Sequence, residues 1–420
     1  MQAPSTMMER ILRLMADKQA SDVYLTAHAP ATIRINGECV PINNQALPPE
    51  ATMNLLMDIL PPNRIEELRE TGELNMAHPM AGVGNFRISA MRQRGTYAAV
   101  IRFISPDIPK LGSLNLPVVL ERLVMEKRGL ILMVGATGAG KSTTLAAMLD
   151  HRNARVPGHI LTIENPIEYM FTNRKSLVNQ REVGTDTATL QMALKNALRQ
   201  APDVIMIGEI RDRETMTAAI AYAQSGHLCL ATLHANNSYQ ALNRILSFYP
   251  VEVRPTLLGD LAAALKSIVS QRLIPALDGG RVPAVEVLLN TKLVADLIEK
   301  SDFGGVKEAM DNAIAEGSQT FEQDLSRLVR EQRIDRKQAL AFADSPTNLL
   351  WRLQNEATRY SANQAQNDDA TSNEPTFTDI TLDVRPSGFG ASGFGSTGYE
   401  LSGFRDSRLG SAVDSRLGEA

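Results

Sequence analysis

The sequence predicts two folded domains, of which the second is an α/β domain with a mainly parallel sheet. Residues 129–145 join an apolar run, a glycine-rich loop and the start of a helical pattern. Apolar runs then alternate with helical patterns as far as residue 289, which is typical of a parallel sheet covered on both faces. Residues 1–104 predict a small α+β domain instead.

The predicted α+β domain contains two helical patterns and four strand-like runs. Pro61 and Pro62 are expected to end the second helix, Asn36-Gly37 to turn the chain, and Arg94-Gly95 to close a hairpin. The helices are predicted at 8–18 and 51–60, and the strands at 21–25, 31–37, 85–90 and 98–103.

The second domain, residues 118–356, follows a predicted linker at 105–117 that is rich in proline. A helix at 213–225 is expected to stop at Gly226, and 293–355 predicts several amphipathic helices. The predicted strands are 130–134, 160–164, 204–208, 228–232 and 284–289.

Residues 357–420 differ in composition from the rest of the chain. Asn, Gln, Ser, Gly and Asp dominate there, and Ser-Gly-Phe-Gly and Asp-Ser-Arg-Leu-Gly each occur twice. Such a segment buries too little apolar surface to offset its ordering entropy, so we expect a disordered tail. The repeats are either contact segments for a partner or have no function of their own.

Composition excludes several classes of protein. The 420 residues carry a formal charge of −4, and residues 361–420 hold nine acidic residues and four arginines, so the remainder is nearly neutral. A near-neutral chain without a basic stripe argues against nucleic acid as a partner. Two cysteines cannot form a disulfide framework or a four-cysteine zinc site. The chain has no signal-peptide pattern and no apolar run of about 18 residues, so no direct membrane insertion is expected.

The glycine-rich loop is a complete P-loop signature, G-x4-G-K-S, between a strand and a helix. Its backbone N–H groups are predicted to surround the phosphates of ATP, because glycines allow close approach. Lys141 is expected to reach the β- and γ-phosphates, and Ser142 to ligate Mg²⁺. The predicted nucleotide-binding residues are Gly135, Ala136, Thr137, Gly138, Ala139, Gly140, Lys141, Ser142 and Thr143.

Two further predicted strands end in carboxylates. Glu209 follows the apolar run 204–208, where it is placed to orient the attacking water and accept its proton. Glu164 ends the run 160–164 and is expected to contact Mg²⁺ or its waters, with Glu168 as a weaker candidate. The candidate metal ligands are therefore Ser142, Glu164 and Glu209.

Two histidines, His227 and His234, stand at the two ends of one predicted strand. Either one is structural, or one of them contacts the γ-phosphate and transmits its presence to neighbouring elements. The sequence does not choose between the two residues.

These motifs together resemble the secretion ATPase superfamily and, within it, the PilT/PilU family of type IV pilus retraction ATPases. The resemblance covers about residues 5–350. It rests on the N-terminal signature at 21–37, the aspartate box at 162–169, the Walker B segment at 199–212 and the histidine box at 226–236. In the aspartate box, Asn165 stands where the family usually has an aspartate.

The resemblance implies a PAS-like N-terminal domain and a RecA-like ATPase domain, assembled as a homo-hexamer that uses ATP and Mg²⁺. It further implies Arg87 and Arg102 as arginines that reach a phosphate on closure, so both are catalytic candidates beside Lys141, Glu164, Glu209, His227 and His234. The implied location is cytoplasmic, peripheral at the inner-membrane pilus machine. The implied partners are a platform protein of that membrane and a sister retraction ATPase.

Residues 290–299 favour an accessory member of this family. They keep an apolar rhythm, and Leu293, Val294, Leu297 and Ile298 are expected to cover one helix face against the core. Asp296 and Glu299 stand where main retraction motors of the family carry arginines. The expected function is an ATP-hydrolysing accessory motor for pilus retraction and twitching motility. The alternatives are a self-sufficient retraction motor and an ATP-binding structural subunit with little turnover.

Overall fold

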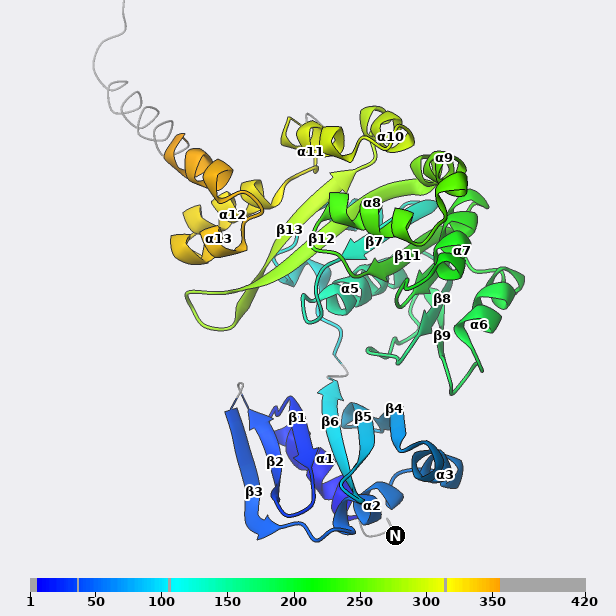
Figure 1. The fold of residues 1–420 in the computed structure, drawn as a ribbon, viewed down its shortest axis with the longest axis vertical. Helices are drawn as coiled ribbons and strands as arrows, with labels where there is room; N and C mark the ends of the chain where they lie inside the picture. The colour runs from blue at the N-terminus through cyan, green and yellow to red at the C-terminus, as the bar shows by residue number, and fades with distance from the viewer. Residues whose placement is uncertain (1–5, 36–37, 105–106, 313–315, 356–420) are drawn as a thin grey trace, which may run out of the picture. The chain divides into compact units, whose positions relative to one another are not determined.

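The computed structural model describes residues 6–35, 38–104, 107–312 and 316–355. Within these ranges the chain forms two β-sheets, each with its own helices (Figure 1). The predicted turn at Asn36-Gly37 and the predicted tail lie outside the described residues. The domain boundaries given above remain predictions.

The N-terminal sheet has six strands in the order β3-β2-β1-β6-β5-β4, and each neighbouring pair is antiparallel. The predicted hairpin is confirmed, because β5 and β6 pair on either side of Arg94-Gly95. The strands are β1 (Asp22–Leu25), β2 (Pro30–Ile35), β3 (Glu38–Ala46), β4 (Glu73–Met80), β5 (Gly84–Gln93) and β6 (Thr96–Ile104).

Three helices accompany this sheet: α1 (Met7–Asp17), α2 (Ala51–Met57) and α3 (Pro62–Thr71). Met8, Leu12 and Met15 of α1 share one buried core with strand residues such as Ile88. Helix α3 was not predicted, because Pro61 and Pro62 are also typical of the residues that end a helix. Proline has no N–H to lose at the first turn of a helix, and there Pro62 begins α3.

The second sheet has seven strands in the order β13-β12-β7-β11-β10-β8-β9. Every neighbouring pair is parallel except β12–β13, so the prediction of a mainly parallel sheet is confirmed. The strands are β7 (Gly129–Val134), β8 (Gly158–Glu164), β9 (Ser176–Glu182), β10 (Val204–Ile207), β11 (Leu228–Leu233), β12 (Leu265–Pro275) and β13 (Arg281–Leu289).

Strands β9 and β12 were not predicted from the sequence. Both carry polar residues among the apolar ones, as in Ser270-Gln271-Arg272 of β12, so neither forms a continuous apolar run. Gln271 is nevertheless only 3% exposed. Burial of a polar side chain depends on a partner elsewhere in the fold, which a local pattern does not reveal.

Helices cover both faces of this sheet, and its strand residues alternate between two apolar cores. One core includes Leu145 and Met148 of α5, and the other includes Met216 of α7 and Leu261 of α9. The helices are α4 (Val119–Leu123), α5 (Lys141–Asn153), α6 (Leu190–Ala197), α7 (Arg213–Gln224), α8 (Ser238–Ser247), α9 (Arg254–Ala264), α10 (Lys292–Glu299) and α11 (Phe303–Asp311).

The prediction for α10 is partly wrong. Val294 and Ile298 are buried and Leu297 packs against the core, but Leu293 is 58% exposed. Leu293 lies in the first turn of the helix, where the chain has only just left β13 and the core does not yet cover its side chain. Asp296 and Glu299 are exposed.

Two more helices, α12 (Phe321–Arg330) and α13 (Arg336–Phe342), pack against the long β12–β13 hairpin (Figure 1). They form a separate apolar core with Ile274, Val282 and Ala284 of the hairpin. The predicted amphipathic helices of the C-terminal segment are therefore present within the described residues.

The parallel strands bring distant segments of the chain together at one edge of the sheet. Val134, at the end of β7, pairs with Leu233, and Ile207 of β10 pairs with both Ile163 and Ala231. The loops that follow β7, β8, β10 and β11 therefore meet at the carboxyl edge. Ligands of open α/β sheets bind at this kind of edge.

Candidate active site

The glycine-rich loop follows β7 directly and leads into α5, which begins at Lys141. The Lys141 Nζ donates hydrogen bonds to the carbonyl oxygens of Gly135 (2.8 Å) and Ala136 (2.9 Å). Gly140 has a φ of +88°, and a Cβ there would lie 2.6 Å from Gln271 Nε2. The loop is thus already curled around the ammonium group, and a larger residue at position 140 would have a strained backbone and would displace the Gln271 amide.

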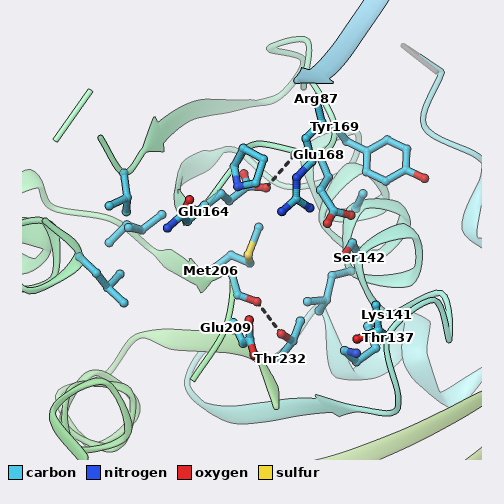
Figure 2. A pocket seen from close by; sticks show the side chains of 18 of the residues that line it. Arg87, Thr137, Lys141, Ser142, Glu164, Glu168, Tyr169, Met206, Glu209 and Thr232 are labelled. Carbon is cyan, nitrogen blue, oxygen red and sulfur yellow. Dashed lines mark hydrogen bonds between the residues drawn. The ribbon is translucent and has the colours of Figure 1, made fainter. Parts of the chain in front are cut away.

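This loop forms one wall of a cavity of about 320 Å³, which falls within the ~300–1,000 Å³ usual for small-molecule sites. Figure 2 shows the side chains that surround it. The predicted site residues that line it are Thr137, Gly138, Lys141, Ser142, Glu164, Glu168, Glu209, His234 and Arg87. Four separate strand ends therefore supply one cavity.

Glu209 lies between two basic side chains. Its Oε1 is 3.0 Å from His234 Nε2, and its Oε2 accepts from Arg211 Nε at 2.8 Å and lies 2.6 Å from a terminal nitrogen of Arg211. Burial lowers the pKa of His234, and nearby Lys141 lowers it further, while Glu209 opposes both. A neutral imidazole can donate to the carboxylate through Nε2, so His234 and Arg211 together hold Glu209 in place.

Lys141 interacts electrostatically with two glutamates of the cavity. Burial lowers the pKa of Lys141, and the charges of Glu209 and Glu168 act in the opposite direction. Nearby negative charge favours the protonated, positively charged form of a lysine. A phosphate chain in this partly enclosed cavity would therefore keep Lys141 charged and would be attracted to it.

Glu164 is 7% exposed at the end of β8. Its Oε1 accepts from Thr162 Oγ1 at 2.7 Å and from Gln180 Nε2 at 3.3 Å. Burial raises the pKa of Glu164 to about 7, although these hydrogen bonds work against the shift. The ionised carboxylate is therefore costly at this buried position and would be favoured by a bound cation.

The raised pKa makes folding stability depend on pH. The unfolded chain loses the Glu164 proton near its ordinary pKa of 4.5, whereas the folded chain keeps it to about pH 7, so stability falls as pH rises between these values. Glu164→Gln mimics the protonated form. Without nucleotide or metal, we expect its advantage in unfolding free energy over wild type to grow by about 2–3 kcal/mol from pH 5 to pH 8.

Urea unfolding of both proteins at the two pH values checks this result. Glu168→Gln is the matched control, because it removes a more exposed carboxylate from the same cavity. A difference between Glu164→Gln and wild type that stays constant with pH would contradict the prediction.

The structure separates the two candidate histidines. His234 follows β11 at the carboxyl edge and lines the cavity, whereas His227 precedes β11 at the amino edge. There the His227 Nδ1 is 3.1 Å from Ser225 Oγ. Only His234 is therefore placed to contact a ligand of this cavity.

Arg87 and Arg102 lie directly opposite each other on β5 and β6, so their side chains share one face of the N-terminal sheet. Arg87 lines the cavity. Arg102 is 60% exposed, and its Nε donates to buried Asp22 at 2.9 Å. Asp22 also lies 3.8 Å from Arg34. In the described part of the chain this carboxylate therefore does not neutralise all of the neighbouring arginines, and positive charge remains available to an anion.

Arg211 and Gln271 are site residues that were not predicted from the sequence. Arg211 follows Glu209 by two residues, and that spacing is a signal which could have predicted their ion pair. Gln271 accepts a hydrogen bond from Thr144 Oγ1 of α5 at 2.8 Å, but it lies on the strand that was missed. Knowledge of β12 was needed to find it.

Two absences in the described part of the chain bear on the site. No group of three His, Cys, Asp or Glu side chains there could hold a metal ion by itself. Among the same residues, every helix is too short or too polar to serve as a membrane span.

A strand, phosphate-binding loop and helix, with a clamped glutamate at a neighbouring strand end, define a P-loop nucleotide hydrolase. The family model described as "Type II/IV secretion system protein" matches residues 4–330, and the chain belongs to this family.

Relatives of known type support this assignment. The chain is 47% identical to the type IV pilus ATPase PilU of Pseudomonas aeruginosa over 342 residues, which cover 81% of this chain and 90% of the relative. It is 37% identical to the retraction ATPase PilT of the same organism, over 81% of this chain and 98% of PilT. A crystal structure of the pilus retraction motor PilT with bound ADP matches with a TM-score of 0.76 and 38% identity, covering 82% of this chain and 99% of that one.

Proposed function

We propose that this chain is an ATPase that drives type IV pilus retraction and twitching motility as an accessory to a PilT-type motor. The observation that carries the proposal is one cavity that is lined by the P-loop lysine together with Glu164 and Glu209. The relatives named PilU and PilT supply the process in which such a site acts.

Each site residue has a role in this proposal. Loop N–H groups and Lys141 bind the β- and γ-phosphates, with the backbone of residues 135–143 around them. Glu209 orients the attacking water and accepts its proton, and His234 holds Glu209 and contacts the γ-phosphate. His227 has no part in this chemistry.

Mg²⁺ fits the oxygen donors of the cavity. Ser142 and Glu164 both line it, and Glu209 is a third candidate. Mg²⁺ is usually held by one or two protein oxygens together with phosphates and water, so a dedicated cluster of protein ligands is not required. When bound, the ion neutralises charge on the transferring phosphoryl group.

The pilus ATPase relatives support a proposal for the assembly and location of this chain. We propose a homo-hexamer in the cytoplasm, peripheral at the inner-membrane pilus machine, with a platform protein and a sister PilT-type ATPase as partners. In this assembly Arg87 and Arg102 approach the phosphates when the domains close. Guanidinium groups suit the task, because they remain charged and form paired hydrogen bonds to phosphate.

Arg87→Ala should lower turnover at least about tenfold, equivalent to about 1.4 kcal/mol of transition-state stabilisation, with ADP affinity close to wild type. The reason is that the contact forms on closure and not on nucleotide binding. Steady-state hydrolysis and ADP titration measure the two quantities. Arg92→Ala is the control, since Arg92 is exposed on the same strand. Wild-type turnover in both Arg87→Ala and Arg102→Ala would refute the arginine assignment.

The accessory role is inferred from α10. Asp296 and Glu299 are exposed there, so this surface presents acids where the family resemblance leads us to expect arginines in a main motor. Exchanging cations for acids changes which surfaces can pair without unfolding the helix. The test is a strain in which this protein is the sole retraction ATPase. We expect little retraction in that strain and normal retraction once a PilT-type motor is restored.

Efficient retraction by this protein alone would make it a self-sufficient motor. Purified protein with no measurable ATP hydrolysis, either alone or with the sister motor, would favour the structural-subunit alternative. The two assays therefore separate the three functions.

A further inference from the structure

Strand β12 braces the phosphate loop at both of its ends. Ser270 pairs with Val134, the residue before the loop, so Gln271 lies beside Gly135. A Cβ on Gly135 would be 2.6 Å from the Gln271 carbonyl oxygen, and one on Gly140 would be 2.6 Å from its Nε2. The amide also holds α5 through Thr144. A loop that moves when phosphate binds must therefore move against Gln271.

Arg272, the next residue of β12, points to the opposite face of the strand. Its guanidinium donates to the carbonyl oxygens of Asn236, at 3.1 Å, and Phe342, and it forms an ion pair with Asp344. The guanidinium carbon also lies 3.9 Å from the ring centroid of Phe321. One side chain thus joins the loop after β11, which begins with His234, to the start of α12 and the end of α13.

Further hydrogen bonds tie the same segments together. Asp344 accepts from Asn237 Nδ2 at 2.7 Å, and Ser345 N–H donates to Glu322 of α12 at 2.7 Å. The helices α12 and α13 have their own apolar core, separate from the two that flank the sheet. Their link to the loop that carries His234 is therefore polar and directional, and a small shift at one end breaks or strains it.

We propose that Arg272 is a positioning residue that couples nucleotide occupancy of the phosphate loop to helices α12 and α13. When nucleotide binds, the phosphate loop moves against Gln271, and His234 moves with the loop that follows β11. Through its contacts with both segments, Arg272 transmits this displacement to Asp344. Linkage requires the reverse effect as well, so a change at these helices alters nucleotide affinity. The inference rests on the proposed function, because it needs a nucleotide in the phosphate loop.

Hydrogen exchange of the full chain, with and without ADP, tests the coupling. In wild type, ADP should slow exchange in α5 and also change exchange in residues 336–349. Arg272→Ala should keep the response in α5, lose the response in 336–349, and change the ADP dissociation constant about fivefold or more. Asp344→Asn removes the ion pair while keeping the side-chain shape. It replaces Arg272→Ala in this experiment if Arg272→Ala does not fold.

Arg327→Ala is the matched control. Arg327 pairs with Asp324 and Glu331 within and just beyond α12, so its loss weakens the helix without cutting the link to Asn236. This variant should keep the response in 336–349. A response that is lost equally in Arg327→Ala would show general loosening of the helices and would overturn the inference.

The exchange results distinguish a failure of the coupling from a failure of the proposed nucleotide site. Protection of α5 without any response in 336–349, or a response that survives in both Arg272→Ala and Asp344→Asn, overturns the coupling alone. Absence of protection in α5 of the wild-type chain overturns the proposed nucleotide site and the coupling with it.

Discussion

Lys141→Ala is expected to abolish productive ATP binding. The Lys141 ammonium already sits inside the loop, bound to the carbonyl oxygens of Gly135 and Ala136, and it faces the cavity that contains Glu209. Removal leaves the phosphate charge without its nearest cation and the loop without its central donor. Breaking a buried charge pair typically costs about 3–5 kcal/mol, which corresponds to roughly 10²–10⁴-fold in affinity.

Titration with a fluorescent ATP analogue, followed by steady-state hydrolysis, measures this loss. Lys127→Ala is the control, because Lys127 is an exposed lysine that does not line the cavity. Hydrolysis close to the wild-type rate in Lys141→Ala would remove the P-loop assignment, and with it the proposed function.

Glu209→Gln should bind ATP normally and hydrolyse it slowly. The amide keeps the length and shape of the side chain, and its oxygen can still accept from His234 or Arg211, but the proton acceptor is gone. General-base catalysis typically contributes about 10²–10⁴-fold. Single-turnover hydrolysis, measured beside ATP affinity, separates the chemical step from binding.

Glu214→Gln is the matched control for Glu209→Gln. Glu214 is an exposed glutamate in the first turn of α7, only five positions along the chain and outside the cavity. If Glu209→Gln turns over within a few-fold of wild type, Glu209 is not the base, and Glu164 becomes the candidate.

Arg211 forms an ion pair with Glu209 that a ligand can displace. It holds the carboxylate of Glu209 through two nitrogens, yet its own side chain is 69% exposed. An exposed ion pair contributes little stability, so Arg211 can leave Glu209 at small cost when a ligand arrives. The role of Glu209 as a base is compatible with the pairing seen in this structure.

Much of the fold and site could be predicted because the signals are local in the sequence. A P-loop is a continuous segment in which strand, glycines, lysine and helix follow one another, so residues 129–145 specify their own conformation. Buried parallel strands are continuous apolar runs, and Glu164 and Glu209 end two of them, so both acids could be predicted as candidates for the nucleotide site. The structure confirms the mainly parallel sheet and the hairpin at Arg94-Gly95.

Other features were decided only by tertiary structure. Polar strands such as β12 are buried because distant side chains satisfy them, as Thr144 does for Gln271. The choice of His234 over His227 depends on which end of β11 meets the phosphate loop, and that is set by strand direction within the sheet. Exposure of Leu293 depends on how α10 leaves β13. For β12 and for the two histidines the deciding contacts join residues far apart in the chain, whereas the sequence by itself determined the local geometry of the phosphate loop and the acids at the strand ends.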